Sequence, residues 1–540
     1  IFSSNPCLQC QCLVKIQLGT CIMVVLEAMM LTSGGLATAR FYAERRSCMD
    51  CMGLVTYFAR TRKNPVTCLH HAFLDRLDTE PDLRHLKFRV GGLVGPHVIF
   101  PYAEDLVAHI ASSKKYRRTN PLDSANSCIA GCITSPWVTG MKPFLEEFLE
   151  SSIWFKPAGP VHKRQRDLFT AFVGKFHDQK IQDEIHCLAK KSLRERIEVN
   201  GAKIASSDLF DLLQEVVAIV QLRFISDFEL GSSMTIREYC DLTNSSFGGM
   251  YAFHSPSREE TQKLAGLCND MLRRGGKNGF VHYIRQHAPK KMTKEQLEKE
   301  LRHNLMASLF LGQQSLANGA FWVIVRLAQE PELLKEIRHN RSTLPEVIAE
   351  ELRIHPPSSP FLMPYLALKG DEYKGLQIGA GDRVVVMPSL VQLNKKEWPN
   401  PMQFEKDRLS DIISKKHKER DTSCSWDGGP APVSVLHAQM KIQETRTCPV
   451  SGDTGTTCPK SNHVGSQKYS SFGVGNATCP MQGFSIGVLN NLLSIVVEEW
   501  NVEVDGMTPT FMSTPVIEHV NVDTGSRPWR RVKATFNPRR

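Results

Sequence analysis

Apolar residues recur at three- and four-residue spacing through most of the chain between about residues 140 and 350. This period predicts amphipathic helices, because apolar side chains spaced in this way share one helix face. Three segments show it clearly, namely "EEFLESSIW" (146–154), "VHKRQRDLFTAFVGKF" (161–176) and "KIQDEIHCLAKKSLRERI" (180–197). The pattern predicts that this part of the chain is mainly helical.

The longest predicted helix covers about residues 294–329, and Pro331 begins the next one. One face of the long helix carries Leu305, Leu309, Gly312, Leu316, Ala320, Val323 and Leu327. Its second half, "GAFWVIVRLA" (319–328), is apolar on nearly every side. A helix with this pattern is buried in the middle of a large domain rather than on its surface.

A smaller β part is predicted at two places. Residues 85–112 indicate two short strands around a glycine turn and then a helix, and "LQIGAGDRVVVMPS" (376–389) is typical of strands. Between these segments, a helix over 345–355 ends at Pro356 and Pro357, because proline removes a backbone donor and clashes with the preceding turn.

Residues 410–468 differ from their surroundings, since they are poor in apolar residues and rich in Gly, Ser, Thr, Lys and Pro. Such a composition predicts an exposed insertion. The predicted organisation is therefore an N-terminal region (1–84) followed by one mainly α domain with a minor β part (85–540), which the insertion interrupts.

The N-terminal region holds one candidate membrane anchor, residues 13–39. Lys15 and Glu27 interrupt it, so no uncharged run reaches the roughly 18 residues that a span needs. Arginines follow it at positions 40, 45 and 46, as expected on the cytoplasmic side of an anchor. A membrane anchor and a buried amphipathic helix both remain open.

Composition describes an ordinary globular chain of 540 residues, with 41% hydrophobic and 23% charged residues and a net charge of +10. Basic and aromatic residues do not alternate along any segment of the sequence, so we expect no nucleic-acid partner. The modest excess of basic residues fits an anionic membrane surface or an acidic protein partner. The 16 cysteines include "CLQCQC" (7–12) and "CMDC" (48–51), whose spacing suits zinc, although reduced thiols explain them equally.

Three separated motifs carry candidate chemistry. Glu350 and Arg353 are spaced i, i+3 on one helix face, and "WPNPMQFEKDR" (398–408) ends in Arg408, a second cation for Glu350. The third motif, "SSFGVGNATCPMQG" (470–483), places Cys479 in a glycine-rich loop before an apolar helix. This thiol is a structural cysteine, a nucleophile or a metal or haem ligand, and His463 is the only base nearby in the sequence for a nucleophile.

In this order, the three motifs resemble the cytochrome P-450 (haem-thiolate) family. The resemblance implies the cytochrome P-450 fold, which is mainly α with a minor β part. It also implies a haem b between the long central helix and the loop of Phe472, Gly475 and Cys479. Cys479 would be the axial ligand of the iron. A thiolate ligand favours cleavage of the O–O bond. Backbone N–H groups and the positive end of the following helix would stabilise its charge.

The resemblance also assigns haem-propionate partners and shows where this chain departs from the family. "GPVHKRQRDLF" (159–169) matches the propionate-binding helix, with His162 and Arg166 one turn apart. A propionate-binding arginine often found after the proline run is Tyr365 here, and the arginine usual two residues before the cysteine is Ala477. Met481 also replaces a usual glycine. These departures raise the alternative of a degenerate haem protein that binds a lipid or a partner without turnover.

The oxygen-activating position of the long helix reads "LFLGQQSLANGAFW" (309–322), with Gln314 and Ser315 where most members have an acid and a threonine. Glutamine only orients water, whereas serine still donates a hydrogen bond to oxygen. This stretch resembles sterol 14α-demethylases, with the bile-acid hydroxylase and prostacyclin synthase branch close by. The resemblance implies insertion of an oxygen atom into a sterol or other lipid. The electrons would come from NADPH through a P-450 reductase. The reaction would take place at the cytoplasmic face of the endoplasmic reticulum membrane. The weak proton relay raises a second alternative, a lipid-peroxide isomerase or dehydratase.

Overall fold

A computed structural model describes the parts of the chain that carry most of these motifs. The described residues are 80, 82–89, 97–119, 144, 146–157, 159–198, 207–231, 234–252, 256–357, 363–392, 394–409, 471–473, 478–505 and 532–539. The candidate anchor (13–39), both cysteine clusters of the N-terminal region and the insertion (410–468) lie outside them.

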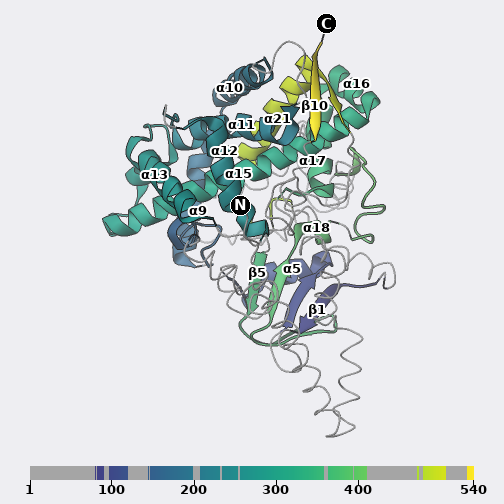
Figure 1. Ribbon diagram of the computed structural model, residues 1–540. Coiled ribbons are helices and arrows are strands. Elements are labelled where there is room, and N and C mark those ends of the chain that lie inside the picture. The colour runs from purple at the N-terminus through teal and green to yellow at the C-terminus, as the bar shows by residue number, and fades with distance from the viewer. Residues whose placement is uncertain are drawn as a thin grey trace, which may run out of the picture.

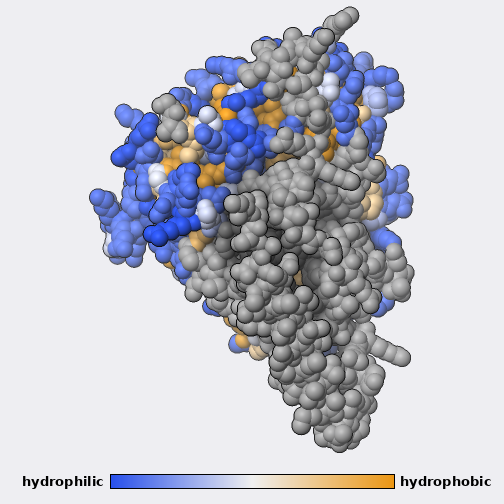
Figure 2. Space-filling view, in the orientation of Figure 1, coloured by the Kyte–Doolittle hydropathy of each residue, from blue (hydrophilic) through white to orange (hydrophobic). Residues whose placement is uncertain are grey.

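Most of the described chain is helical, as the periodicity predicts, and the helices form the upper body in Figure 1. The α-helices are α5 (Glu104–Ser112), α9 (Pro160–Gly174), α10 (Gln179–Glu198), α11 (Leu209–Gln221), α12 (Ile236–Ala252), α13 (Arg258–Arg274), α14 (Phe280–His287), α15 (Lys294–Gln329), α16 (Pro331–His339), α17 (Leu344–Ile354), α18 (Pro388–Val391) and α21 (Gln482–Glu499). A π-helical turn, Leu222–Ser226, extends α11. In Figure 2 the helical surface is mainly hydrophilic, with apolar side chains visible between charged ones.

The long helix α15 runs through the centre of the helical body (Figure 1). Its predicted bounds are confirmed, and a reciprocal hydrogen-bonded cap between Thr293 and Gln296 fixes its start. Nearly every side chain from Leu301 to Leu327 is buried, and α11, α17 and α21 pack against it. None of the helices in the described segments has the length and hydrophobicity needed to cross a membrane.

One predicted helix is wrong in part. Residues 149–156 form turns rather than continuing a helix over 146–154. Two side chains of α15 explain this: the ring nitrogen Nδ1 of His303 accepts from the Ser151 N–H (2.7 Å), and Asn304 Oδ1 accepts from the Ile153 N–H (2.9 Å). Backbone donors that bond to a neighbouring helix are no longer available for a helix of their own.

The larger sheet lies below the helical body in Figure 1, next to α5. Five strands form a sheet in the order β1-β2-β8-β5-β3, namely β1 (His85–Arg89), β2 (His97–Pro101), β8 (Arg383–Val386), β5 (Met363–Ala367) and β3 (Tyr116–Arg118). Only β2 and β8 are paired in parallel. The antiparallel pairing of β3 with β5 places Arg118 directly opposite Tyr365.

Smaller sheets complete the described β structure. Strand β10 (Lys533–Pro538) pairs with β4 (Ser207–Asp208) and with β9 (Trp500–Val504), and β6 (Asp371–Tyr373) pairs with β7 (Leu376–Ile378). Apolar side chains of α5 and the five-stranded sheet, including Leu106, Val107 and Val384, form a second core beside the large helical one.

At Gly319, α15 lies in close contact with two helices that carry the site. A Cβ atom there would lie 3.0 Å from Leu352 Cδ2 of α17 and 3.5 Å from Leu489 Cδ1 of α21. The absence of a side chain at Gly319 therefore lets the three helices approach one another.

We expect Gly319→Leu to destabilise the fold by about 1–3 kcal/mol, because an inserted side chain overpacks the contact with α17 and α21. The matched control is Gly266→Leu in α13, where an added Cβ meets nothing within 4 Å. There the better helix propensity should leave stability unchanged or slightly higher. Chemical denaturation of both variants measures the difference, and equal stabilities would contradict the close approach.

Candidate functional site

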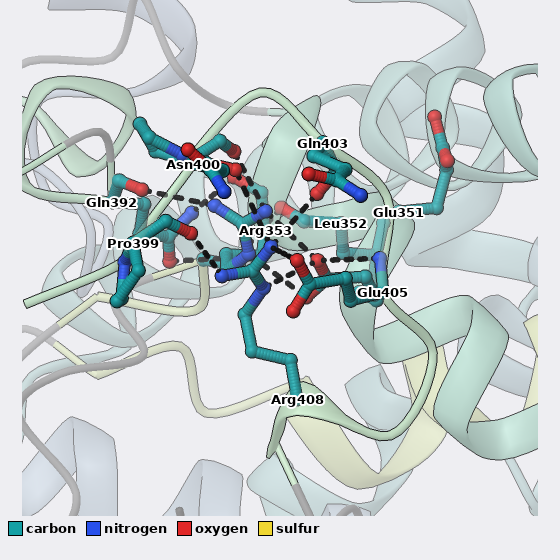
Figure 3. Close-up of polar contacts among 12 residues, drawn as sticks. Glu351, Leu352, Arg353, Gln392, Pro399, Asn400, Gln403, Glu405 and Arg408 are labelled. Carbon is teal, nitrogen blue, oxygen red and sulfur yellow. Dashed lines mark hydrogen bonds and ion pairs between the residues drawn. The ribbon is translucent and has the colours of Figure 1, made fainter. Parts of the chain in front are cut away.

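The Glu350 carboxylate is buried between two arginines, Arg353 and Arg408, which Figure 3 labels. Arg353, one turn later on α17, reaches both carboxylate oxygens at 2.8 Å, and Arg408 Nε lies 3.0 Å from Glu350 Oε1. Glu350 and Arg353 have no exposed surface, and Arg408 is also buried. The structure thus brings together the three residues that the sequence predicts as a clamp.

The remaining guanidinium donors of the clamp bind backbone carbonyls of the irregular segment 394–409. Arg353 donates to the carbonyl of Pro401 (2.7 Å), while Arg408 donates to those of Pro399 and Gln403. The Arg353 guanidinium also lies 5.2 Å from the centre of the Trp398 ring, a cation–π distance. Residues 394–407 form no helix or strand, so the two arginines provide their acceptor oxygens with partners.

A second group of hydrogen bonds joins the clamp to the loop before Cys479. Gln392 accepts from Arg353 through its backbone carbonyl (3.0 Å) and donates its side-chain amide to the Arg353 carbonyl (2.8 Å). Ser471 Oγ contacts Gln392 Oε1 at 3.0 Å and donates to the Leu352 carbonyl at 2.7 Å. The loop is therefore attached to α17 through buried hydrogen bonds.

The loop closes on itself around Cys479. The Cys479 N–H donates to the Phe472 carbonyl at 2.6 Å, and Gly473 between them has a φ of +84°, which glycine adopts without strain. Gly475 and Ala477 lie outside the described residues. Helix α21 begins at Gln482, so the thiol lies immediately before its N-terminal end.

Three groups around the Cys479 sulfur favour the thiolate form. The Met481 N–H, the charge of Arg166 and the side chain of Trp154 each lower the pKa of the thiol, although burial is the larger effect and raises the pKa overall. Cys479 is half-buried and forms no disulfide. Within the described residues, no histidine or carboxylate interacts with the Cys479 thiol as a base for nucleophilic catalysis would.

His162 and Arg166 lie one turn apart on α9, near this loop. Arg166 Nη1 donates to the carbonyl of Thr478, the residue before the cysteine, at 2.7 Å. His162 is buried, its ring binds the Ile153 backbone, and its other ring nitrogen, Nε2, has no partner. Burial, followed by the charges of Arg118 and Arg166, lowers the pKa of His162 to about 4.

Arg118 is a third cation of this group, and the sequence reasoning missed it. The Nη2 atom of Arg118 donates to the Trp154 carbonyl at 2.7 Å. Burial lowers the pKa of Arg118, and the like charge of Arg166 lowers this pKa further. No carboxylate among the described residues forms an ion pair with Arg118. No sequence motif marks Arg118, because the β3–β5 register alone places it beside Tyr365. Trp154 was missed as well, within a segment predicted as plain helix.

These residues fit the haem that the resemblance implies. Its iron needs a thiolate donor, which Cys479 provides, and its two propionates need cations or hydrogen-bond donors. The unpartnered His162 Nε2 and the charges of Arg118 and Arg166 are the features that a bound carboxylate would complete. The donor set matches the group on both its metal and its carboxylate side.

On α15, Gln314 is engaged by α12, whereas Ser315 is not. Gln314 Nε2 donates to Asn244 Oδ1, and Asn244 and Gln214 bind each other through their amides. Gln314 Oε1 is buried without a partner. Ser315 is half-buried and has no hydrogen bond among the described residues, whereas Ser308 on the same helix donates to the Asn304 carbonyl.

Two surface clefts in the described part of the chain are separate from this site. One, of about 820 Å³, is lined by charged residues of α13, α14 and the start of α15, and one of about 560 Å³ surrounds the π-helical turn. Neither is lined by Cys479, Arg166 or Ser315.

Comparison with known proteins agrees with this geometry. The family model described as Cytochrome P450 matches residues 139–421, more than half of the chain. The chain belongs to the cytochrome P450 family. Members of this family are haem-dependent monooxygenase oxidoreductases. The matched range includes α9, α15 and the clamp but ends before the Cys479 loop, so the role of Cys479 depends on the contacts described above.

Curated relatives match over limited ranges. Cytochrome P450 71A12 of Arabidopsis thaliana is 22% identical over 38% of this chain and 45% of its own length. The steroid 17-alpha-hydroxylase/17,20 lyase of Squalus acanthias is 30% identical over 20% of this chain and 24% of its own length. The chain thus spans less than half of the length of each. These plant and steroid enzymes give no support to the sterol 14α-demethylase or prostacyclin synthase branch.

Solved structures show the same fold over nearly the whole molecule. A zebra fish cytochrome P450 solved with progesterone gives a TM-score of 0.58 at 16% identity and covers 87% of this chain and 99% of its own. A cyanobacterial cytochrome P450 bound to retinoic acid gives 0.57 at 12% identity, with coverages of 84% and 92%. The predicted fold, mainly α with a small β part, is confirmed.

We expect Glu350→Gln to reduce the free energy of unfolding by about 3–5 kcal/mol, because it leaves Arg353 buried without a counter-charge and Arg408 with only the exposed Glu405 carboxylate. The control Glu332→Gln removes a carboxylate whose pairing with Lys335 is exposed, and should cost less than about 1 kcal/mol. Urea denaturation monitored by circular dichroism gives both values. A clamp variant as stable as the control would show that the buried pair does not hold the fold.

Proposed function

We propose that this protein is a haem-thiolate monooxygenase that inserts one oxygen atom of O₂ into a sterol or another lipid. The observation that carries the proposal is the position of Cys479. Its sulfur lies before the N-terminal end of α21 and interacts with the Met481 N–H, and Arg166 binds the carbonyl next to it. These contacts stabilise a thiolate, which is the form that binds iron.

Each part of the site has a separate task in this proposal. Cys479 binds the iron, while Arg166 and His162 bind the propionates and thereby fix the orientation of the ring. The haem supplies the binding and reductive activation of O₂. The clamp of Glu350, Arg353 and Arg408 keeps the loop rigid, because Gln392 and Ser471 join the two.

Proton delivery is assigned to α15. The free hydroxyl of Ser315 would donate a hydrogen bond to dioxygen, and Gln314 Oε1 would orient a water molecule that passes on a proton. Gln314 cannot itself release a proton at neutral pH. The protons therefore come through water and not from a side-chain acid at this position.

The substrate class is supported by resemblance. The sequence around Gln314 is similar to that of sterol 14α-demethylases, and structures of the same fold have been solved with progesterone, retinoic acid and myristic acid. These ligands are all lipids. We propose a sterol or related lipid on these grounds.

Electrons and location complete the proposal. We propose NADPH as the electron source, through a P-450 reductase that docks on a basic face, and the cytoplasmic face of the endoplasmic reticulum as the site of action. The candidate anchor (13–39) with its following arginines supports a membrane location. Activity assays with and without NADPH, a reductase and lipid vesicles would measure how turnover depends on the electron source and on the membrane.

A second candidate function is a dehydratase or lipid-peroxide isomerase on the same fold. The missing acid at Gln314 favours it, and the indoleacetaldoxime dehydratase of Arabidopsis thaliana is 22% identical over 37% of this chain and 44% of its own length. Such a reaction needs no external electrons. Steady NADPH consumption coupled to product formation would exclude it.

Cys479→Ser tests the proposed ligand directly. The wild-type protein, reduced and exposed to carbon monoxide, should show the shifted Soret band of a thiolate-bound haem, because sulfur donates electron density to the iron. The variant should lose this band and most of its haem. Cys187→Ser, an exposed free cysteine on α10, serves as the matched control and should keep the band. An unchanged spectrum for Cys479→Ser would refute the proposed ligation.

Ser315→Ala should lower the yield of product per NADPH roughly tenfold and divert electrons to hydrogen peroxide, because one hydrogen-bond donor is lost at the oxygen site. Ser315→Thr keeps the hydroxyl and should retain coupling. Parallel assays of NADPH, peroxide and product measure the effect. Equal coupling in Ser315→Ala and the wild type would remove Ser315 from the proton path.

A further inference from the structure

Buried polar atoms without a hydrogen-bond partner gather around the middle of α15. In the described part of the chain they include both amide atoms of Gln221, the Tyr239 hydroxyl, Gln314 Oε1 and Asn318 Oδ1, which come from α11, α12 and α15. Folded proteins pair almost all of their buried polar atoms, because burying one without a partner is unfavourable. A group of exceptions at one place therefore needs a reason that packing does not give.

Gln221, the last residue of α11, is the clearest of these exceptions. Its side chain is 1% exposed, and neither Nε2 nor Oε1 has a partner among the described residues. Gln214, seven residues earlier on the same helix, shows the usual arrangement, since its amide forms two hydrogen bonds with Asn244. A side chain of the same length without polar atoms would suit the position of Gln221 better, as far as folding is concerned.

The Gln221 amide lies against α15 at Gly312. A Cβ atom on this glycine would be only 2.4 Å from Gln221 Nε2, so the amide group occupies the space that the missing side chain leaves. Gly312 and Ser315 are three residues apart and therefore share one face of the helix. Together with Leu311 they form a half-buried strip on a stretch of α15 that is otherwise buried. The Gln221 amide thus borders the strip that carries the free hydroxyl of Ser315.

The chemistry of an amide suits this place in the proposed function. Gln314 stands where most family members carry an acid, and it cannot release a proton at neutral pH, so protons reach Ser315 through water. The Nε2 group of Gln221 is a donor, so it binds a water molecule through the water oxygen. Both O–H groups of that water molecule then remain free to donate to other atoms. A water molecule held in this way is oriented as a proton donor.

We propose that Gln221 binds a water molecule beside Ser315 and thereby orients a proton donor at the oxygen site, in place of the acid that α15 lacks. The inference rests on the proposed monooxygenase function and assigns a role in it to α11, which carries none of the sequence motifs. Gln221 is a positioning residue in this scheme, because it acts through the water molecule that it holds.

The test replaces the amide by an apolar group of the same length. Gln221→Met should leave the urea denaturation midpoint of the haem-loaded protein unchanged or higher, since no polar group is then buried without a partner. The yield of product per NADPH should fall about tenfold, the effect of one lost hydrogen bond, and the electrons should appear as hydrogen peroxide. The C–O stretching frequency of the reduced carbon monoxide complex should rise, because a hydrogen-bond donor near the oxygen end of carbon monoxide lowers it.

Gln221→Glu is the conservative variant. Burial raises the pKa of a glutamic acid, and the protonated form has a donor and an acceptor, as glutamine does. The product yield per NADPH should therefore stay close to that of the wild type at low pH and decline as the pH rises and the carboxyl group ionises. A side chain that only fills space would give no such pH profile.

Gln182→Met on α10 is the matched control, since this glutamine has the partners that Gln221 lacks. Its Nε2 donates to the Phe176 carbonyl, and its Oε1 accepts from Asn491 at 2.8 Å. The control should lower the denaturation midpoint and leave the product yield and the C–O frequency as they are in the wild type. The two methionine variants thus have opposite expected effects on stability and on oxygen chemistry.

The outcomes separate the explanations. An unchanged C–O frequency and product yield in Gln221→Met would show that the amide only fills the space at Gly312. A lower denaturation midpoint in this variant would show that the amide stabilises the fold. Either result overturns the inference and leaves the proposed function in place, whereas a wild-type protein without NADPH-dependent product would overturn both.

Discussion

The Glu350 carboxylate is the constraint on which the site depends. This carboxylate is fully buried. Its single negative charge offsets one of the two positive charges of Arg353 and Arg408, and it orients both guanidinium groups. Because Arg353 and Arg408 are fixed by it, their other N–H groups can satisfy carbonyls of residues 394–407, which form no helix or strand. The same Arg353 binds Gln392, which contacts Ser471 at the start of the cysteine loop. A buried charge pair that is costly to break is thereby connected to the loop that carries the thiol.

The two groups of arginines in this protein solve opposite electrostatic problems. The clamp encloses its own anion, so its charges are satisfied by the chain alone. In the group around His162, one ring nitrogen has no partner, and burial, followed by the charges of Arg118 and Arg166, lowers the pKa of His162. An added carboxylate would raise that pKa again, so cofactor binding and proton uptake by His162 are physically coupled.

The features predicted from the sequence are those encoded locally. The bounds of α15, the proline-terminated helix α17 and the i, i+3 pair of Glu350 and Arg353 follow from periodicity and spacing. Arg118 could not be predicted, because its neighbour Tyr365 is 247 residues away in the chain and only strand register joins them. The turns at 149–156 were missed for a similar reason, since His303 and Asn304 of α15 bind backbone donors that a local pattern assigns to a helix.

Helix α15 connects these non-local features, since it contributes to both sides of the site. Near its start, His303 and Asn304 hold the turn that carries Trp154; in its middle lie Gln314 and Ser315; and further on, Gly319 permits contact with α17 and α21. All of these positions are fixed relative to one another by the 100° rotation per residue of a straight helix. A one-residue shift of α15 would therefore displace the cation group, the free hydroxyl of Ser315 and the helix contact at the same time. The helix must be buried and tightly packed along its length, because only close packing on every side prevents such a shift.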